Sequence, residues 1–298
     1  MSVRVDSDQC TGCGSCLSHC PLGLLELSSG DDVNARGVRH IVLNNPTACR
    51  ECGSCELMCT AAALHISGAR NGYDLIDREH IPPHSGCCLG SLAKALADAI
   101  AELDIVDDVV LFKKKASDVN LLVESYDYLD ERFFEDGLRY KREHPEKLVV
   151  IICSSSKIHT VANNEERLRA LADEQITFIN TLNWFESDPG ISTLTCGGSR
   201  ILEELAERES GAPSFAARTS VRDAAGMKRL KDNLTTALTC QMRGLPYSVV
   251  EMVFPCFYRL AGRPQTLMPS ERIAEINCWF DQHVLPDYSA EILKEVTG

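Results

Sequence analysis

Residues 10–20 read CTGCGSCLSHC, and residues 49–59 read CRECGSCELMC. Both runs have the spacing C-x2-C-x2-C-x3-C. The first contains Cys10, Cys13, Cys16 and Cys20, and the second contains Cys49, Cys52, Cys55 and Cys59. Eight of the chain's 15 cysteines therefore lie between Cys10 and Cys59, in two equivalent groups. Cysteines grouped in this way are typical of metal ligands rather than of a disulfide framework.

The spacing within each run indicates which metal group the cysteines would bind. Thiolate sulfur is the soft ligand that iron–sulfur clusters require, and three closely spaced cysteines can hold three corners of a cubane. In two-cluster proteins the fourth cysteine of each run ligates the other cluster. We therefore predict two [4Fe-4S] clusters, the first bound by Cys10, Cys13, Cys16 and Cys59 and the second by Cys49, Cys52, Cys55 and Cys20. Gly12, Gly14 and Gly53 fit loops whose backbone amides approach the cluster sulfides.

Structural zinc is the alternative, because C-x2-C is also a zinc-binding spacing. Zinc takes four ligands from two separated pairs, which gives no reason for two identical runs of four cysteines, so the spacing favours iron–sulfur clusters. Residues 1–66 resemble a bacterial-type two-cluster ferredoxin domain, with Pro21 after the first run and Thr60 at the equivalent place after the second. The resemblance implies that this domain transfers single electrons to or from another site.

Length and charge limit what the rest of the chain does. With 298 residues, 44% of them hydrophobic, the chain has room for a second, larger domain. Its net charge of -13 argues against a nucleic-acid-binding surface, whereas acidic proteins do dock on basic patches of redox partners. The longest strongly apolar run, LVVIIC at 148–153, is too short to cross a bilayer. We expect no membrane span and a cytoplasmic location.

The pattern of elements predicts a ferredoxin-like domain at 1–66, a linker at 67–86 and an α/β domain at 87–298. Apolar residues recur at helical spacing from Leu89 to Leu103, and the run at 148–153 is typical of a strand buried on both faces. A helix at 164–173 and a strand at 176–182 complete a βαβ unit, which predicts a parallel sheet. Further helices are expected at 197–209, 222–242 and 269–282, with a strand at 247–253.

The order of elements from about 84 to 285 resembles the thiamine-diphosphate-binding β subunit of 2-oxoacid:ferredoxin oxidoreductases. The matching segments are HSGCCLGSLAKALADAI, FFEDGLRYKREHPEKLVVIICSSSK, TLNWF around Asn183, and VVEMVFPC ending at Cys256. The resemblance implies a doubly wound, mainly parallel-sheet domain within a larger complex that decarboxylates a 2-oxoacid to acyl-CoA. It also implies partner subunits of the pyrimidine-binding and CoA-binding type, and a redox acceptor protein.

The resemblance implies that thiamine diphosphate and Mg²⁺ would lie at Ser154, Ser155, Ser156 and Asn183. In the family a Gly-Asp-Gly stands where this chain has the three serines, so the carboxylate that binds the cation is missing. Hydroxyls alone are poor Mg²⁺ ligands, and we expect weak thiamine binding or none. A plain strand-to-helix loop with a capping hydroxyl is the alternative interpretation of these serines.

The family's third-cluster motif is also incomplete. Only Cys87 and Cys256 of its four cysteines are present, with His84 at another of the four places, so these thiols are expected to be structural. Two hypotheses remain. The chain is either an iron–sulfur subunit beside a partner-assisted thiamine site, or a non-catalytic electron-transfer or assembly subunit that has lost thiamine.

Overall fold

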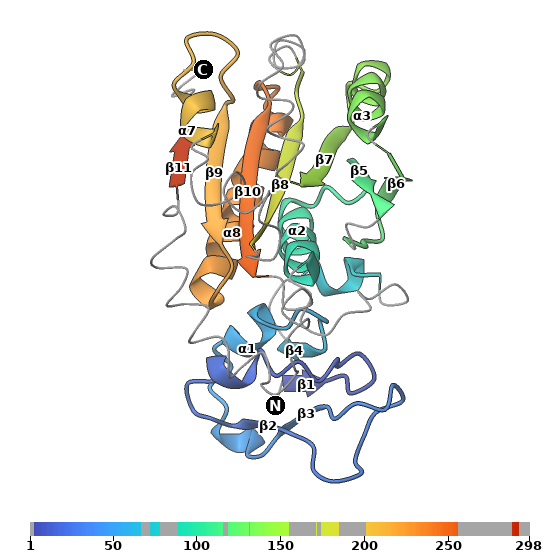
Figure 1. Ribbon diagram of the computed structural model, residues 1–298, viewed down its shortest axis with the longest axis vertical. Helices are drawn as coiled ribbons and strands as arrows, with labels where there is room; N and C mark the ends of the chain where they lie inside the picture. Colours follow the sequence, from blue (N-terminus) through green and yellow to red (C-terminus); the bar gives the residue numbers. More distant parts are fainter. Residues whose placement is uncertain are drawn as a thin grey trace.

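The computed structural model describes residues 3–66, 72–77, 89–115, 119–130, 132–154, 171, 174–184, 201–255 and 288–291 (Figure 1). The amino-terminal domain is built on two antiparallel strand pairs. Strand β1 (Val3–Val5) pairs with β4 (Leu64–Ile66), and β2 (Leu25–Leu27) pairs with β3 (Ile41–Leu43). Short helices lie between them: η1 (Leu17–His19), η2 (Pro46–Ala48) and α1 (Ser54–Leu57).

These strand pairs join the two halves of an internal repeat. The sequence offset that relates Cys10 to Cys49 also relates β2 to β4. Strand β1 precedes the first cysteine run and pairs with β4, which follows the second run. Strand β3 precedes the second run and pairs with β2, which follows the first. The pairing therefore brings the end of each run next to the start of the other.

The second domain contains a seven-stranded sheet in the order β11-β9-β10-β8-β7-β5-β6. Its strands are β5 (Val109–Lys114), β6 (Glu124–Tyr128), β7 (Leu148–Ser154), β8 (Thr177–Trp184), β9 (Phe215–Ser220), β10 (Ser248–Pro255) and β11 (Tyr288–Glu291). Six strands run parallel, and β11 pairs antiparallel with β9 at one edge. The predicted mainly parallel α/β fold is confirmed.

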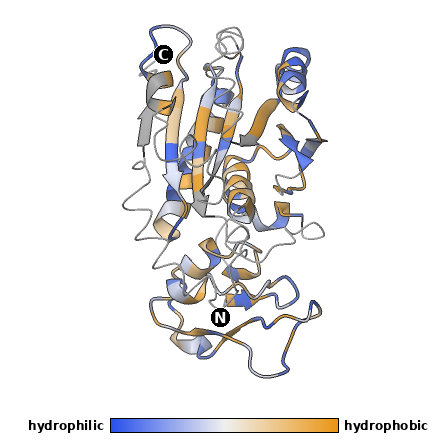
Figure 2. Ribbon diagram, in the orientation of Figure 1, coloured by the Kyte–Doolittle hydropathy of each residue, from blue (hydrophilic) through white to orange (hydrophobic). Residues whose placement is uncertain are grey.

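Helices pack on both faces of this sheet. Helices α2 (Leu89–Leu103) and α8 (Ala224–Met242) share one hydrophobic core with alternate residues of the strands, including Val150 and Ile179. The other face contacts α3 (Arg132–Glu143) and α7 (Ile201–Ala206). Figure 2 shows α2 and much of the central strands in hydrophobic colours, as expected of elements enclosed between layers.

The elements predicted at 89–103, 148–153, 176–182, 222–242 and 247–253 are all present, and α7 forms within the helix predicted at 197–209. The helices expected at 164–173 and 269–282 lie almost wholly outside the described residues. Strands β5, β6, β9 and β11 of this sheet were not predicted. Strand β9 is Phe-Ala-Ala-Arg-Thr-Ser, whose mixed composition gives no strong strand signal even though all six residues are buried.

The larger domain directs the carboxyl ends of its parallel strands toward the amino-terminal domain (Figure 1). Helix α2 begins beside that domain: a side chain on Gly90 would lie 1.9 Å from the carbonyl oxygen of Thr60. Part of the predicted linker, the 3-10 helix η3 (Gly72–Leu75), packs on α2 as well. Within the residues that the structure describes, no helix combines the length and apolar character needed to span a membrane.

Candidate metal centres

Four cysteines from both runs surround one cavity in the amino-terminal domain. Its walls include Cys10, Cys13, Cys16 and Cys59. The remaining walls are mostly apolar, with Val5, Ile41, Met58 and Leu64 among them. Three neighbouring cysteines of one run and the last cysteine of the other therefore face a common space.

The other four cysteines also lie near one another. The charges of Cys52, Cys20 and Cys49 all act on Cys55, so the last cysteine of the first run lies near three cysteines of the second. No three His, Cys, Asp or Glu side chains converge closely enough to hold a single ion anywhere in the described part of the chain. The second set is more accessible than the first, because Cys52 is exposed whereas Cys10 and Cys16 are buried.

Backbone amides donate hydrogen bonds to the cysteine sulfurs, and the pattern repeats in the two halves. The amide of Leu24 donates to Cys20 Sγ at 3.4 Å, and the amide of Ala63 donates to Cys59 Sγ at 3.1 Å. In the first half Cys13 Sγ lies 3.4 Å from Ser15 Oγ, and in the second Cys52 Sγ lies 3.7 Å from Ser54 Oγ. Such contacts stabilise thiolates and tune the potential of a cluster that they bind.

Three pairs of equivalent residues adopt the left-handed backbone conformation: Gly12 and Glu51, Gly14 and Gly53, and Gly23 and Ala62. Gly12 also has a steric requirement, because a Cβ atom there would lie 2.6 Å from the carbonyl oxygen of Arg39. Glu51 and Ala62 adopt a conformation that costs non-glycine residues energy. The sequence pointed to Gly12, Gly14 and Gly53, but not to Gly23, Glu51 or Ala62.

Burial makes the cysteine thiolates unfavourable without a cation beside them. It raises the pKa of Cys59 to about 12 and that of Cys55 to about 11, with the charges of neighbouring cysteines adding to both. Burial is also the main cause of the raised pKa of Cys16, followed by the charge of Cys59. Hydrogen bonds from Ser54 instead lower the pKa of the exposed Cys52. Metal binding requires thiolates, so the iron of a cluster would offset the cost of burying them.

Comparison with known proteins identifies this domain. The family of 4Fe-4S dicluster domains matches residues 2–62. An uncharacterized ferredoxin of Methanocaldococcus jannaschii is 32% identical over 68 residues, which are 22% of this chain and 95% of that protein. Through this domain, the chain belongs to the ferredoxin family. Ferredoxin-2 of Desulfomicrobium norvegicum is 53% identical over 32 residues, 11% of this chain and 54% of that protein.

One solved structure is similar to this chain over 73% of its length. It is 2-oxoglutarate:ferredoxin oxidoreductase from Magnetococcus marinus with 2-oxoglutarate, coenzyme A and succinyl-CoA bound. The sequences are 13% identical, 93% of that chain is covered, and the TM-score is 0.48.

Two of the four thiamine-like positions, Ser154 and Asn183, lie at the edge of the sheet that faces the ferredoxin domain. Ser154 is the last residue of β7 and is in register with Thr181 of β8. Asn183 is two residues further along β8, in register with Phe254 of β10. The backbone therefore brings Ser154 and Asn183 to the carboxyl ends of adjacent strands. Ser155, Ser156, His84, Cys87 and Cys256 lie outside the described residues.

Sequence reasoning missed the residues that join the two domains. Met58 lines the cavity of the four cysteines and also packs in the core beside α2 and α8. Glu56, between Cys55 and Cys59, is buried within 3.9 Å of Lys94 on α2. Their only signal in the sequence was an acidic residue inside a cysteine run and a lysine on the apolar face of a helix.

Proposed function

We propose that this chain is the electron-transfer subunit of a 2-oxoacid:acceptor oxidoreductase-type complex and that it binds two [4Fe-4S] clusters. The first cluster would be held by Cys10, Cys13, Cys16 and Cys59, and the second by Cys49, Cys52, Cys55 and Cys20. The observation that carries the proposal is the cavity bounded by cysteines of both runs. When bound, each cluster supplies one-electron redox chemistry.

The fold explains why the fourth ligand would come from the other run. Cys59 leads into β4, which pairs with β1 just before Cys10, and Cys20 leads into β2, which pairs with β3 just before Cys49. The apolar residues around the cavity exclude water, and backbone amides stabilise sulfur charge. These features favour a cluster that changes charge with little rearrangement.

The position of the ferredoxin domain supports its role within a larger redox protein. In open parallel sheets, ligands bind outside the carboxyl ends of the strands. That edge of this sheet faces the ferredoxin domain, and the buried cysteines lie near the domain interface through Met58. Electrons released at the sheet edge would enter the buried set first and leave through the more exposed set around Cys52.

The identity of the site that releases those electrons is the second part of the proposal. The resemblance in sequence favours oxidative decarboxylation of a 2-oxoacid to acyl-CoA, performed with pyrimidine-binding and CoA-binding partner subunits. Since the serines at 154–156 offer no carboxylate for Mg²⁺, this chain would contribute electron transfer rather than its own thiamine site. A non-catalytic assembly subunit is the alternative, favoured by the same substitution.

Anaerobic purification tests both parts. We expect about eight iron and eight acid-labile sulfide per chain, because two Cys₄ sites would each hold a four-iron cubane. A colourless protein that contains zinc would disprove cluster binding. Native mass measurement from the source cell should recover a hetero-oligomer that reduces an acceptor when given a 2-oxoacid and coenzyme A. Recovery of the 32.8 kDa chain alone would contradict the proposed complex.

A further inference from the structure

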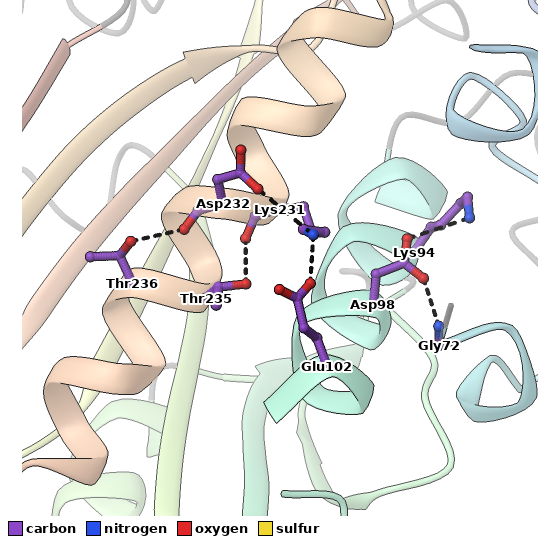
Figure 3. A network of polar contacts seen from close by, with 8 residues as sticks. All are labelled: Gly72, Lys94, Asp98, Glu102, Lys231, Asp232, Thr235 and Thr236. Carbon is purple, nitrogen blue, oxygen red and sulfur yellow. Dashed lines mark hydrogen bonds and ion pairs between the residues drawn. The ribbon is translucent and has the colours of Figure 1, made fainter. Parts of the chain in front are cut away.

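A buried ionic network crosses the boundary between the ferredoxin domain and the α/β domain. Lys94 Nζ lies 3.9 Å from Glu56 Oε1 in the cysteine loop and 3.5 Å from Asp98 Oδ2 one helical turn along α2. Figure 3 shows Lys94 and Asp98 on α2, with the backbone amide of Gly72 donating to Asp98 Oδ1 at 2.6 Å. Glu56 Oε1 also lies 3.4 Å from Nδ1 of His65, a residue of β4 in the ferredoxin domain. The network thus joins the cysteine loop, the connector and α2.

All three charged groups are removed from water. Lys94 is 2% exposed, Glu56 6% and Asp98 8%. A buried charge costs several kcal/mol unless it is paired, so the position of each group depends on the others. Around them the two domains are in close contact, with Gly90 against Thr60 and Gly72 against the backbone of Ala97. Glu56 is therefore held in a fixed position relative to both domains.

The place of Glu56 in the chain puts this fixed charge next to the proposed clusters. It follows Cys55 directly and precedes Cys59, so it lies between proposed ligands of the two clusters. Reduction adds negative charge to a cluster, which a nearby carboxylate disfavours and a nearby ammonium favours. Water and salt screen such interactions at the surface but much less in the interior.

We propose that Glu56 and Lys94 are positioning residues that set the reduction potential of the adjacent clusters through their buried charges. The inference rests on the proposed function, since it requires bound clusters. Glu56 makes reduction less favourable, Lys94 offsets part of this effect, and Asp98 holds Lys94 in place. The α/β domain thereby contributes to the reduction potential of the clusters through Lys94, which is not a cluster ligand.

Glu51 provides a matched control for Glu56. It precedes Cys52 directly, as Glu56 follows Cys55, but it is exposed whereas Glu56 is buried. Both substitutions, Glu56→Gln and Glu51→Gln, remove one negative charge next to a proposed ligand. If burial decides the effect, only the first should change the potential strongly.

The experiment is a redox titration of the purified full chain, followed by electron paramagnetic resonance, with iron and sulfide content measured for each variant. Glu56→Gln should raise the potential of at least one cluster, changing the equilibrium constant for reduction by about tenfold or more, the scale of a unit charge about 12 Å away at an effective dielectric constant of about 20. Glu51→Gln should change it by about twofold or less. The double variant Glu56→Gln/Lys94→Gln should return toward the wild-type value.

A purely structural role would lower cluster content without this pattern of potentials. Equal shifts for Glu56→Gln and Glu51→Gln, or no shift in either, would overturn the inference. Should Glu56→Gln fail to assemble clusters, Asp98→Asn removes a charge from the same network outside the cysteine loop. It should give a smaller rise in the same direction, and an unchanged potential in that variant would also overturn the inference. Wild-type protein without clusters would instead refute the proposed function.

Discussion

The carbonyl oxygen of Thr60 occupies the space that a side chain on Gly90 would need. A Cβ atom at residue 90 would lie 1.9 Å from that oxygen, and Thr60 directly follows Cys59. The first turn of α2 therefore rests on the cysteine loop, with backbone against backbone. This backbone contact helps to hold the small ferredoxin domain at one edge of the sheet.

Gly90→Ala should destabilise the chain at this contact. A carbonyl oxygen cannot move aside without its backbone, so we expect a loss of about 1–3 kcal/mol in the free energy of unfolding. Thermal or denaturant unfolding would measure it. Gly137→Ala on α3 is the comparison, because the new methyl group there would meet side chains rather than backbone, with Ile151 Cδ1 at 2.9 Å and Phe112 Cγ at 3.2 Å. Similar losses in both variants would mean that the Thr60 contact has no special role.

Replacing the last cysteine of each run should damage the opposite cluster. Cys59→Ser should impair the cluster that we assign to Cys10, Cys13 and Cys16, since these residues line the same cavity. Cys20→Ser should impair the cluster assigned to Cys49, Cys52 and Cys55. Spectroscopy that resolves the two clusters would detect the crossed pattern. Damage confined to the run that carries each substitution would point to two independent sites.

The buried ion pair between β9 and β10 should matter for stability. Arg218 Nε donates to Glu251 Oε2 at 2.9 Å, and Asn180 Nδ2 donates to Glu251 Oε1 at 3.1 Å. Arg218→Met would leave the carboxylate of Glu251 buried without its guanidinium, at a cost of about 3–5 kcal/mol in unfolding free energy.

The exposed pair of Arg132 and Asp130 is the control for this substitution. The side chain of Arg132 is 76% exposed, so Arg132→Met should cost at most about 1 kcal/mol. Denaturant unfolding of both variants gives the comparison. An Arg218→Met protein as stable as the wild type would show that the pair contributes little.

The three serines at 154–156 should support only poor binding of thiamine diphosphate. Ser155→Asp would restore a carboxylate ligand for Mg²⁺, and we expect at least about a tenfold gain in thiamine diphosphate affinity, equivalent to about 1.4 kcal/mol. Calorimetry with and without Mg²⁺ would measure it, with Ser155→Asn as the uncharged control. No gain would mean that more than the cation ligand has been lost. Tight, Mg²⁺-dependent binding by the wild type would contradict the expected loss of the cofactor.

The sequence could predict the parts of this protein whose signals are local. Cysteine spacing identified the ferredoxin domain, since a cubane needs three ligands within one tight loop. Helical periodicity located α2, and the apolar run at 148–153 located β7. The parallel sheet followed from the βαβ order, because a right-handed crossover permits few alternatives.

Strand β5 did carry a local signal that the prediction missed, because Val-Val-Leu-Phe-Lys-Lys is a short apolar run rich in β-branched residues. Strands β6 and β9 have mixed compositions, and tertiary contacts rather than local composition make them strands. Arg218 is buried inside β9, where Glu251 on the neighbouring strand pairs with its guanidinium. In the same way, Glu51 and Ala62 adopt left-handed conformations that their residue types disfavour, since each occupies the place that a glycine takes in the other half of the repeat.

By itself, the sequence determined the cysteine repeat, the α/β class and the absence of a carboxylate at the thiamine-like loop. Only the tertiary structure decided which surfaces meet: Thr60 on Gly90, Glu56 on Lys94, and the sheet's carboxyl edge toward the ferredoxin domain. The physical reason is that ligand spacing and hydrophobic period are properties of neighbouring residues. The pairing of a buried charge such as Glu56 depends on a partner in another domain, Lys94, which no local pattern reveals.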